Sequence, residues 1–150
     1  MNLSEQLGAG LSGIEQLRAI MASGRSAGIG TTMDFRLTVI EDGFVVFEGT
    51  PGLHVYNPIG MVHGGYAATL LDSACGCAVH TKLSATQAYT TLELKVSYLK
   101  AMTANTGPVR AEGKVIQMGR RPAFSEGRLV DAAGTLYATA TSSLLVMERK

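Results

Sequence analysis

The stretch Asn57-Pro58-Ile59-Gly60-Met61-Val62-His63-Gly64-Gly65 runs directly into an apolar segment from Tyr66 to Thr81, and together they decide the fold. One carboxylate, Asp72, interrupts the apolar segment and is the only Asp, Glu, Lys or Arg between Gly49 and Thr81. A lone acid in a segment that reads as a buried helix is costly unless another group pairs with it or a reaction uses it. Asp72 is therefore the first candidate functional residue.

The rest of the chain predicts one shorter helix and six strands. Apolar residues recur at three- and four-residue steps from Leu11 to Met21, which predicts an amphipathic helix ending near Ser23-Gly24. Alternation with a period of two predicts strands within residues 32–39, 44–48, 92–98, 109–115, 124–130 and 136–147. The predicted order is one helix, two strands, the long apolar helix and four strands.

A helix that is apolar nearly all round must be covered on most sides. The order of elements therefore predicts an α+β fold, in which one six-stranded antiparallel sheet curls around the long helix at about residues 64–81. We expect an N-terminal helical extension over residues 1–30, followed by the domain proper over residues 31–150. A curled sheet leaves strand edges unpaired, and unpaired edges favour dimerisation edge to edge.

Length, charge and cysteine content exclude several classes of protein. The 150 residues fit one domain, and a net charge of +1 with 17% charged residues offers no basic surface for nucleic acid. Cys75 and Cys77 lie two apart on the predicted helix, which favours free thiols in a reducing cytoplasm. Glu5 and Glu15 argue against a signal peptide, and Asp72 argues against a membrane helix. We expect a cytoplasmic protein without membrane or nucleic-acid partners.

The glycines at the start of the long helix predict an oxyanion site. The N–H groups of Gly64 and Gly65 have no acceptor within the helix, and the helix dipole favours negative charge at that end. Glycine also lets a ligand approach the backbone closely, although tight packing against a strand is an alternative reason for glycine here. Asp72 supplies the complementary group, as a general base toward water or as a direct nucleophile.

The spacing of these residues predicts a site shared between two chains. Eight residues separate Gly64 from Asp72, which is roughly 12 Å along an α-helix. Both groups must lie within about 3–3.5 Å of the reacting atoms. If the two residues act together, Gly64 of one subunit must face Asp72 of another across a dimer interface.

The pattern Asn57-Pro58, His63-Gly64-Gly65 and Asp72, followed by Thr91 and Tyr98-Leu99, resembles the hotdog-fold acyl-CoA thioesterases. The most similar branch contains the phenylacetate-pathway (PaaI-like) and 4-hydroxybenzoyl-CoA thioesterases, and the resemblance covers about residues 34–147. It implies a hydrolase that cleaves an acyl-CoA into free acid and coenzyme A, with the Gly64 amide as oxyanion donor. It also implies a homodimer with two shared sites and a homotetramer built as a dimer of dimers.

The resemblance implies supporting roles for three further residues. Asn57 and His63 match positions that orient the thioester or the attacking water, and Thr91 matches a strand hydroxyl that assists the acid. A second branch carries Glu as its acid and a hydroxyl one helical turn later, where this chain has Gly76. This chain departs from the second branch at both positions, with Asp72 as its acid and Gly76 one turn later. Both differences favour the first branch, which has Asp and a strand hydroxyl.

Coenzyme A as part of the substrate implies phosphate-binding cations, and no metal or redox cofactor. Arg120 and Arg121, adjacent in a predicted turn, are candidate phosphate ligands with Lys100 behind them, although a solvated turn is the alternative. Gly65 is a candidate for close approach of the substrate. The three histidines show no ligand spacing on one helix face, so we expect no metal site.

Alternatives remain open at this point. Asp72 could be structural, bonded to Ser73 or to an arginine across an interface. A hotdog module that binds or senses acyl-CoA without turnover would explain a pocket but not a lone acid within it. Enoyl-CoA hydration or dehydration also uses this fold, in a different sequence setting. The pattern permits either an aryl or a medium-chain acyl group.

Overall fold

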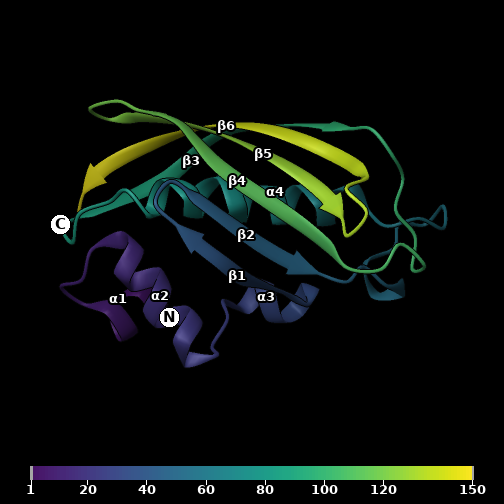
Figure 1. The fold of residues 1–150 in the computed structure, drawn as a ribbon, viewed down its shortest axis with the longest axis horizontal. Coiled ribbons are helices and arrows are strands. Elements are labelled where there is room, and N and C mark those ends of the chain that lie inside the picture. Colours follow the sequence, from purple (N-terminus) through teal and green to yellow (C-terminus); the bar gives the residue numbers. More distant parts are fainter. Residues whose placement is uncertain (1, 150) are drawn as a thin grey trace.

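The computed structural model describes residues 2–149 and consists of one antiparallel sheet curled around a long helix (Figure 1). The helices are α1 (Leu3–Gly8), α2 (Gly13–Ser23), α3 (Gly28–Met33) and α4 (Gly64–His80), with a short 3-10 turn, η1 (Leu53–Val55). The strands are β1 (Phe35–Glu41), β2 (Phe44–Gly49), β3 (Gln87–Tyr98), β4 (Val109–Met118), β5 (Pro122–Asp131) and β6 (Leu136–Glu148). They lie in the order β1-β2-β4-β5-β6-β3, which confirms the predicted α+β hotdog architecture.

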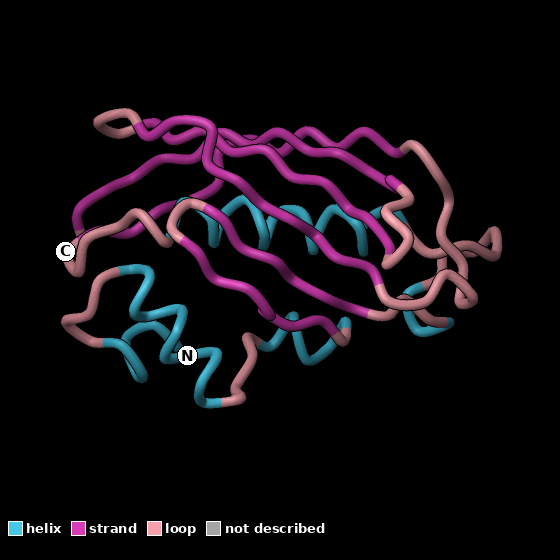
Figure 2. The backbone as a smooth tube through the Cα atoms, in the orientation of Figure 1, coloured by secondary structure: helices cyan, strands magenta, loops and turns pink. Residues whose placement is uncertain are grey.

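Helix α4 is the centre of the core because its sequence is apolar on most sides. Ten of its 17 residues are buried, and the side chains of Leu70, Leu71 and Ala74 have no exposed surface. The helix contacts strands β2 to β6, so the sheet covers it from several directions (Figure 2). Full burial of a leucine contributes about 1.5–3 kcal/mol, so this one helix supplies a large part of the hydrophobic stabilisation.

Two glycines let α4 pack directly on the sheet backbone. Gly113 of β4 and Gly127 of β5 are register partners on the face that contacts the helix. A methyl group on Gly113 would overlap the backbone carbonyl of Ala74, and one on Gly127 would lie 3.1 Å from Leu71 Cδ2 and 3.2 Å from Cys75 Sγ. This glycine notch, formed by Gly113 and Gly127, fixes how deeply the middle of α4 sits in the sheet.

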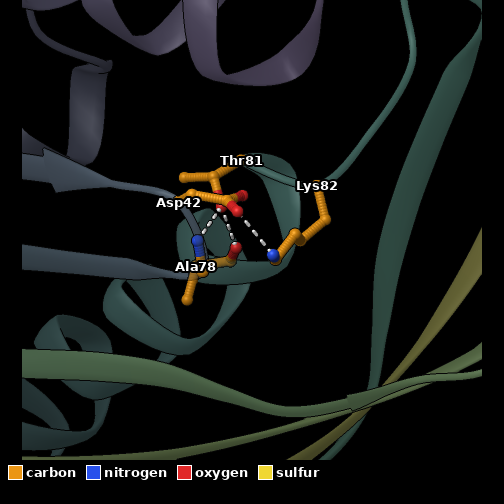
Figure 3. A network of polar contacts seen from close by, with 5 residues as sticks. Asp42, Ala78, Thr81 and Lys82 are labelled. Carbon is orange, nitrogen blue, oxygen red and sulfur yellow. Dashed lines mark hydrogen bonds and ion pairs between the residues drawn. The ribbon is translucent and has the colours of Figure 1, made fainter.

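The end of α4 is held by the turn between β1 and β2 (Figure 3). The Gly43 N–H donates to Thr81 Oγ1 at 2.8 Å, and the Thr81 hydroxyl donates in turn to the carbonyl of Ala78 at 2.6 Å. Lys82 forms an ion pair with Asp42 at 2.8 Å beside this contact. Because the ion pair is solvent-exposed on the Asp42 side, the buried hydroxyl is the more important of the two connections.

The N-terminal extension contains three helices rather than the single helix expected. Helix α2 confirms the predicted one and ends at Gly24, whose φ of 69° is left-handed. Helices α1 and α3 have six residues each, too few for an apolar repeat to be recognised. Residues 32–33, predicted as strand, belong to α3, because Asp34 at φ 55° ends that helix immediately before β1. The expected boundary between residues 30 and 31 thus falls within α3.

Helix α2 is docked on the last turn of α4. The Gly13 N–H donates to the Leu83 carbonyl at 2.9 Å, and a methyl group on Gly13 would overlap the His80 carbonyl. The buried Gln16 side chain reaches His80 through a 2.9 Å hydrogen bond between Oε1 and Nε2. Helix α2 therefore lies beside β1 and the end of α4, with α1 packed on α2 and α3 packed on β1 (Figure 1).

The two edges of the sheet differ in their cover. Strand β1 is contacted by α2 and α3, whereas β3 runs along the other edge with Leu92 and Tyr98 64% and 57% exposed. A long edge strand with large apolar side chains is a ready site for pairing with another chain. Within residues 2–149, no helix combines the length and apolarity needed to cross a membrane.

The glycine notch predicts a steep cost for one added methyl group. Gly113→Ala is expected to lower the free energy of unfolding by about 1–3 kcal/mol, because the backbone of α4 has to move away from β4. Urea denaturation would measure the loss. The matched control is Gly28→Ala, where nothing lies within 4 Å of the added atom. Equal stability of the two variants would contradict the role given to the notch.

The docking of α2 predicts a dependence of stability on pH. Burial, with a smaller contribution from Arg149, lowers the pKa of His80 from 6.5 to about 4. The unfolded chain thus binds this proton first, so stability is complete above about pH 6.5 and falls as the pH decreases toward 4, by about 3 kcal/mol at pH 4. In His80→Gln that contribution is absent. Urea titrations at several pH values between 7 and 4 would give the free energy of unfolding of both proteins, and the two values should converge as the pH falls. A difference between the two free energies that stays constant with pH would refute the prediction.

Candidate active site

Asp72 and Thr91 meet at the wall of a cavity of about 670 Å³. Asp72 lies in the middle of α4 and is half-buried, and Thr91 lies on the adjacent strand β3. The Thr91 hydroxyl donates to Asp72 Oδ1 at 3.1 Å. The structure therefore brings together the acid and the strand hydroxyl that the sequence singled out separately.

The Asp72 carboxylate has no counter-charge among residues 2–149. Over residues 2–149 it forms no ion pair, and Thr91 is its only hydrogen-bond partner. Ser73, which a structural reading would pair with it, also lines the cavity but forms no hydrogen bond with it. The remaining oxygen of Asp72 is left for water or a ligand.

The two cysteines beside Asp72 are poor nucleophiles. Both are free, and burial raises the pKa of Cys75 to about 11 and that of Cys77 to about 12. Both therefore stay protonated near neutral pH, where a nucleophilic thiolate is required. Asp72 is the better candidate for the reacting group in this cavity.

Tyr89 is a cavity residue that the sequence analysis missed. Burial is the main cause of a pKa for Tyr89 well above 10.0, and its hydroxyl interacts with the Cys77 thiol. A methyl group on Gly76 would lie 2.7 Å from the Tyr89 hydroxyl oxygen. Gly76 therefore makes room for this phenol, at the position where the second branch carries a helix hydroxyl. The alternation of side chains along β3 could have identified Tyr89 as a site residue, because it puts Tyr89 on the same face as Thr91.

The start of α4 presents one free backbone donor. His63 is the N-cap, and its Nδ1 accepts the N–H of Gly65 at 2.8 Å. In neutral His63 the proton then lies on Nε2. The N–H of Gly64 has no acceptor anywhere in the described part of the chain. Of the two predicted amides, that of Gly64 is available to a ligand and that of Gly65 is already used.

Gly64 also packs against an aromatic ring of β3. The Tyr98 hydroxyl donates to the Gly64 carbonyl at 2.9 Å, and a methyl group on Gly64 would lie 3.0 Å from the ring. The alternative reason for glycine, tight packing against a strand, therefore applies as well. The two reasons are compatible, because this contact uses the carbonyl and leaves the N–H free.

Asn57 shapes the loop that leads into α4. Its Oδ1 accepts from the N–H groups of Ile59 and Met61, at 3.1 and 3.0 Å. Its Nδ2 has no hydrogen-bond partner among residues 2–149, which leaves two N–H groups for a ligand. Asn57 lines a second cavity, of about 370 Å³, together with His63, Gly64 and Lys100.

The predicted cation cluster does not form within one chain. Lys100 follows β3, and its backbone N–H donates to the Tyr137 carbonyl at 3.1 Å. The Lys100 Nζ lies 5.7 Å from the centre of the Tyr137 ring. Arg120 and Arg121 lie in the exposed turn between β4 and β5, where the Arg121 carbonyl accepts from Val146. Tyr137 and Val146 are nine residues apart on β6, roughly 30 Å along a strand. The expectation that Lys100 stands behind the arginines is therefore wrong for a single chain.

The two halves of the candidate site lie apart in one chain. Asp72 and Thr91 line the larger cavity, and Asn57, His63 and Gly64 line the smaller one. Among the described residues, no group of three or more His, Cys, Asp or Glu side chains could hold a metal ion. The arrangement offers a carboxylate at one place and an unpaired backbone donor at another.

Comparisons with known proteins identify the family to which the chain belongs. Residues 59–138 match the thioesterase superfamily. A candidate esterase of Saccharolobus solfataricus is 30% identical over 118 residues, which cover 79% of this chain and 82% of that protein. A candidate esterase of Halobacterium salinarum is 38% identical over 84 residues, or 55% of this chain and 54% of the relative. The chain thus spans about half the length of the second relative.

Solved structures share the fold at low sequence identity. A thioesterase from Haemophilus influenzae has a TM-score of 0.77 at 16% identity, covering 85% of this chain and 88% of its own. A thioesterase family protein from Silicibacter pomeroyi has a TM-score of 0.79 at 23% identity, covering 92% and 100%. The PaaI protein of the E. coli phenylacetic acid degradation operon has a TM-score of 0.77 at 17% identity, covering 97% and 96%. The resemblance to hotdog thioesterases is confirmed.

Proposed function

Because the chain belongs to the thioesterase superfamily, a family of thioester hydrolases, we propose that it hydrolyses an acyl-CoA to free acid and coenzyme A. One observation carries the proposal: Asp72 faces a cavity with a single hydrogen-bond partner, Thr91, and no counter-charge within residues 2–149. A half-buried carboxylate held in this way is costly for stability, which favours a use in chemistry.

In the proposed reaction, Asp72 acts on water. Thr91 holds Oδ1, and the other carboxylate oxygen takes a proton as the water oxygen bonds to the thioester carbonyl carbon. The C–S bond then breaks, the electron pair leaves with the coenzyme A sulfur, and that sulfur receives the proton. Direct attack by Asp72, followed by hydrolysis of the resulting anhydride, gives the same products.

We place the oxyanion donor, the Gly64 N–H, on the partner subunit. Thr91 pairs with Leu144 and Tyr98 pairs with Ala138, so both face the helix side of β3, the open edge of the sheet. Antiparallel pairing of two β3 edges reverses one strand relative to the other. The reversal would bring Gly64 of the partner subunit, held by its own tyrosine, toward Asp72 and create two equivalent sites.

The same reversal supports roles for the remaining candidates. It would bring Lys100 of the partner subunit toward the end of the sheet that carries Arg120 and Arg121, where coenzyme A phosphates need cations. The free amide of Asn57 and the Nε2–H of His63 would orient the thioester.

We further propose a cytoplasmic location, where the two thiols stay reduced. We also propose that two dimers associate into a tetramer, and sedimentation would measure this association.

Asp72→Asn should abolish hydrolysis, because the amide cannot accept the proton. We expect kcat/KM to fall by about 10²–10⁴-fold.

Thr91→Val should lower kcat/KM by about 10–100-fold, because a hydrogen bond to a charged group is lost, whereas Thr91→Ser should keep most of the activity. Chromatographic detection of coenzyme A released from phenylacetyl, hydroxybenzoyl, hexanoyl and palmitoyl thioesters avoids interference from Cys75 and Cys77. Tight binding of every thioester without turnover would favour a sensing module instead.

A shared site predicts complementation between two inactive chains. Asp72→Asn lacks the base, and Gly64→Pro lacks the donating N–H at a helix position that tolerates proline. A mixed dimer would contain one site with both native groups, so co-expression should restore about a quarter of wild-type activity. Gly64→Ala is the matched control, since it adds a side chain against Tyr98 but keeps the N–H. Should the mixture stay as inactive as its components, the site is not shared in this way.

A further inference from the structure

We infer that the N-terminal helices form one wall of the acyl-binding cavity, and that the acyl group is an aliphatic chain of medium length. This inference rests on the proposed thioesterase function and concerns its substrate. It starts from the cavity of about 670 Å³, because Asp72 and Thr91 line the same space as residues of α1, α2 and α3. An acyl group whose carbonyl lies at Asp72 therefore has continuous room beneath the N-terminal helices.

The walls of this cavity are mostly apolar. Most of the large aliphatic and aromatic side chains that line it come from α2, β1 and β2: Leu17, Ile20, Met21, Phe35, Leu37 and Phe47. Leu3 of α1, Ile29 of α3 and Tyr89 of β3 complete this apolar lining. The two arginines among the lining residues, Arg25 and Arg36, are exposed and so belong to its rim. An apolar interior with charge at the rim suits a hydrocarbon chain more than a polar acyl group.

Two polar side chains that line the cavity, those of His80 and Tyr89, are already engaged within the chain. His80 bonds to Gln16, whose amide nitrogen donates to the Leu11 carbonyl at 2.9 Å, and Tyr89 interacts with Cys77. A ring hydroxyl on an aryl substrate would need a free buried partner to offset its loss of water. The His80 Nε2 and the Tyr89 hydroxyl are thus used within the chain, which favours an unsubstituted chain over a hydroxyaryl group.

The volume and the character of the α2 wall favour a chain over a small ring. A cavity of about 670 Å³ lies within the usual range for ligand sites of about 300–1,000 Å³, and exceeds the 370 Å³ of the cavity beside Gly64. Ile20 follows Gln16 by one helical turn and so shares the face that docks on α4. Met21 is unbranched and can adapt its shape to the end of a chain.

The cavity predicts a dependence on chain length. The value of kcat/KM should rise by about fourfold for each added methylene, the effect of burying it, until the cavity is full. Ile20→Trp fills part of the space and should lower the ratio of kcat/KM for octanoyl-CoA to that for butyryl-CoA by at least about tenfold. Ile14→Trp is the matched control, because Ile14 lies on the same helix outside the cavity lining and should leave the ratio unchanged.

The ratio of kcat/KM for octanoyl-CoA to that for butyryl-CoA tests the acyl cavity separately from the thioesterase activity. A lower octanoyl-to-butyryl ratio in Ile20→Trp, with no change in Ile14→Trp, supports the acyl cavity. A shift of the preferred acyl length to longer chains in Ile20→Ala supports it as well. An unchanged ratio in both Ile20 variants, with wild-type thioesters still hydrolysed, overturns the cavity and leaves the thioesterase intact. A preference of the wild type for hydroxybenzoyl over every aliphatic thioester also overturns it. Absence of hydrolysis with any thioester contradicts the proposed function itself.

Discussion

The contact between the backbone of α4 and the glycine notch of Gly113 and Gly127 determines the rest of the arrangement. A side chain at either glycine would push the helix away from the sheet, so the notch sets how deeply the middle of α4 is buried. His63 and Tyr98 hold the start of the helix, and the buried Thr81 ties its end to the β1–β2 turn. A helix fixed in this way holds the groups that it carries with little freedom, which is what the proposed chemistry would require.

The same rigidity explains why one chain alone could not complete the proposed site. Gly64 and Asp72 are attached to one straight element and cannot approach each other, whatever the loops around them do. The unpaired edge of β3 is unfavourable in an isolated chain, and so is a carboxylate that finds no counter-charge among the described residues. An edge-to-edge dimer would remedy both: it would pair the edge strand and supply the missing donor to the acid. The proposed assembly and the proposed chemistry would therefore both follow from one geometric limit.

Sequence periodicity was sufficient for the elements with strong local signals and insufficient where distant segments meet. Helix α2 and the six strands follow from repeats of 3.6 and 2 residues, and the long helix follows from its continuous apolar segment. The contact between Asp72 and Thr91 agrees with their expected pairing. The six-residue helices α1 and α3 are too short to show a period. The separation of Lys100 from Arg120 depends on the order of strands in the sheet, which no local pattern specifies. The role of Gly76 was hidden because it depends on the Tyr89 side chain from another element.

The N-terminal helices differ from α4 in how firmly they are held, and this difference bears on specificity. Helix α2 is attached through Gly13 and Gln16 at one end of α4, whereas α4 itself is enclosed by five strands. Changes in α2 therefore alter the cavity wall without moving Asp72 or the glycine notch. On the proposed function, the groups that react would thus be separate from the groups that select the substrate. Selectivity for acyl length could then change through residues such as Ile20 and Met21, while the chemistry would stay fixed on the buried helix.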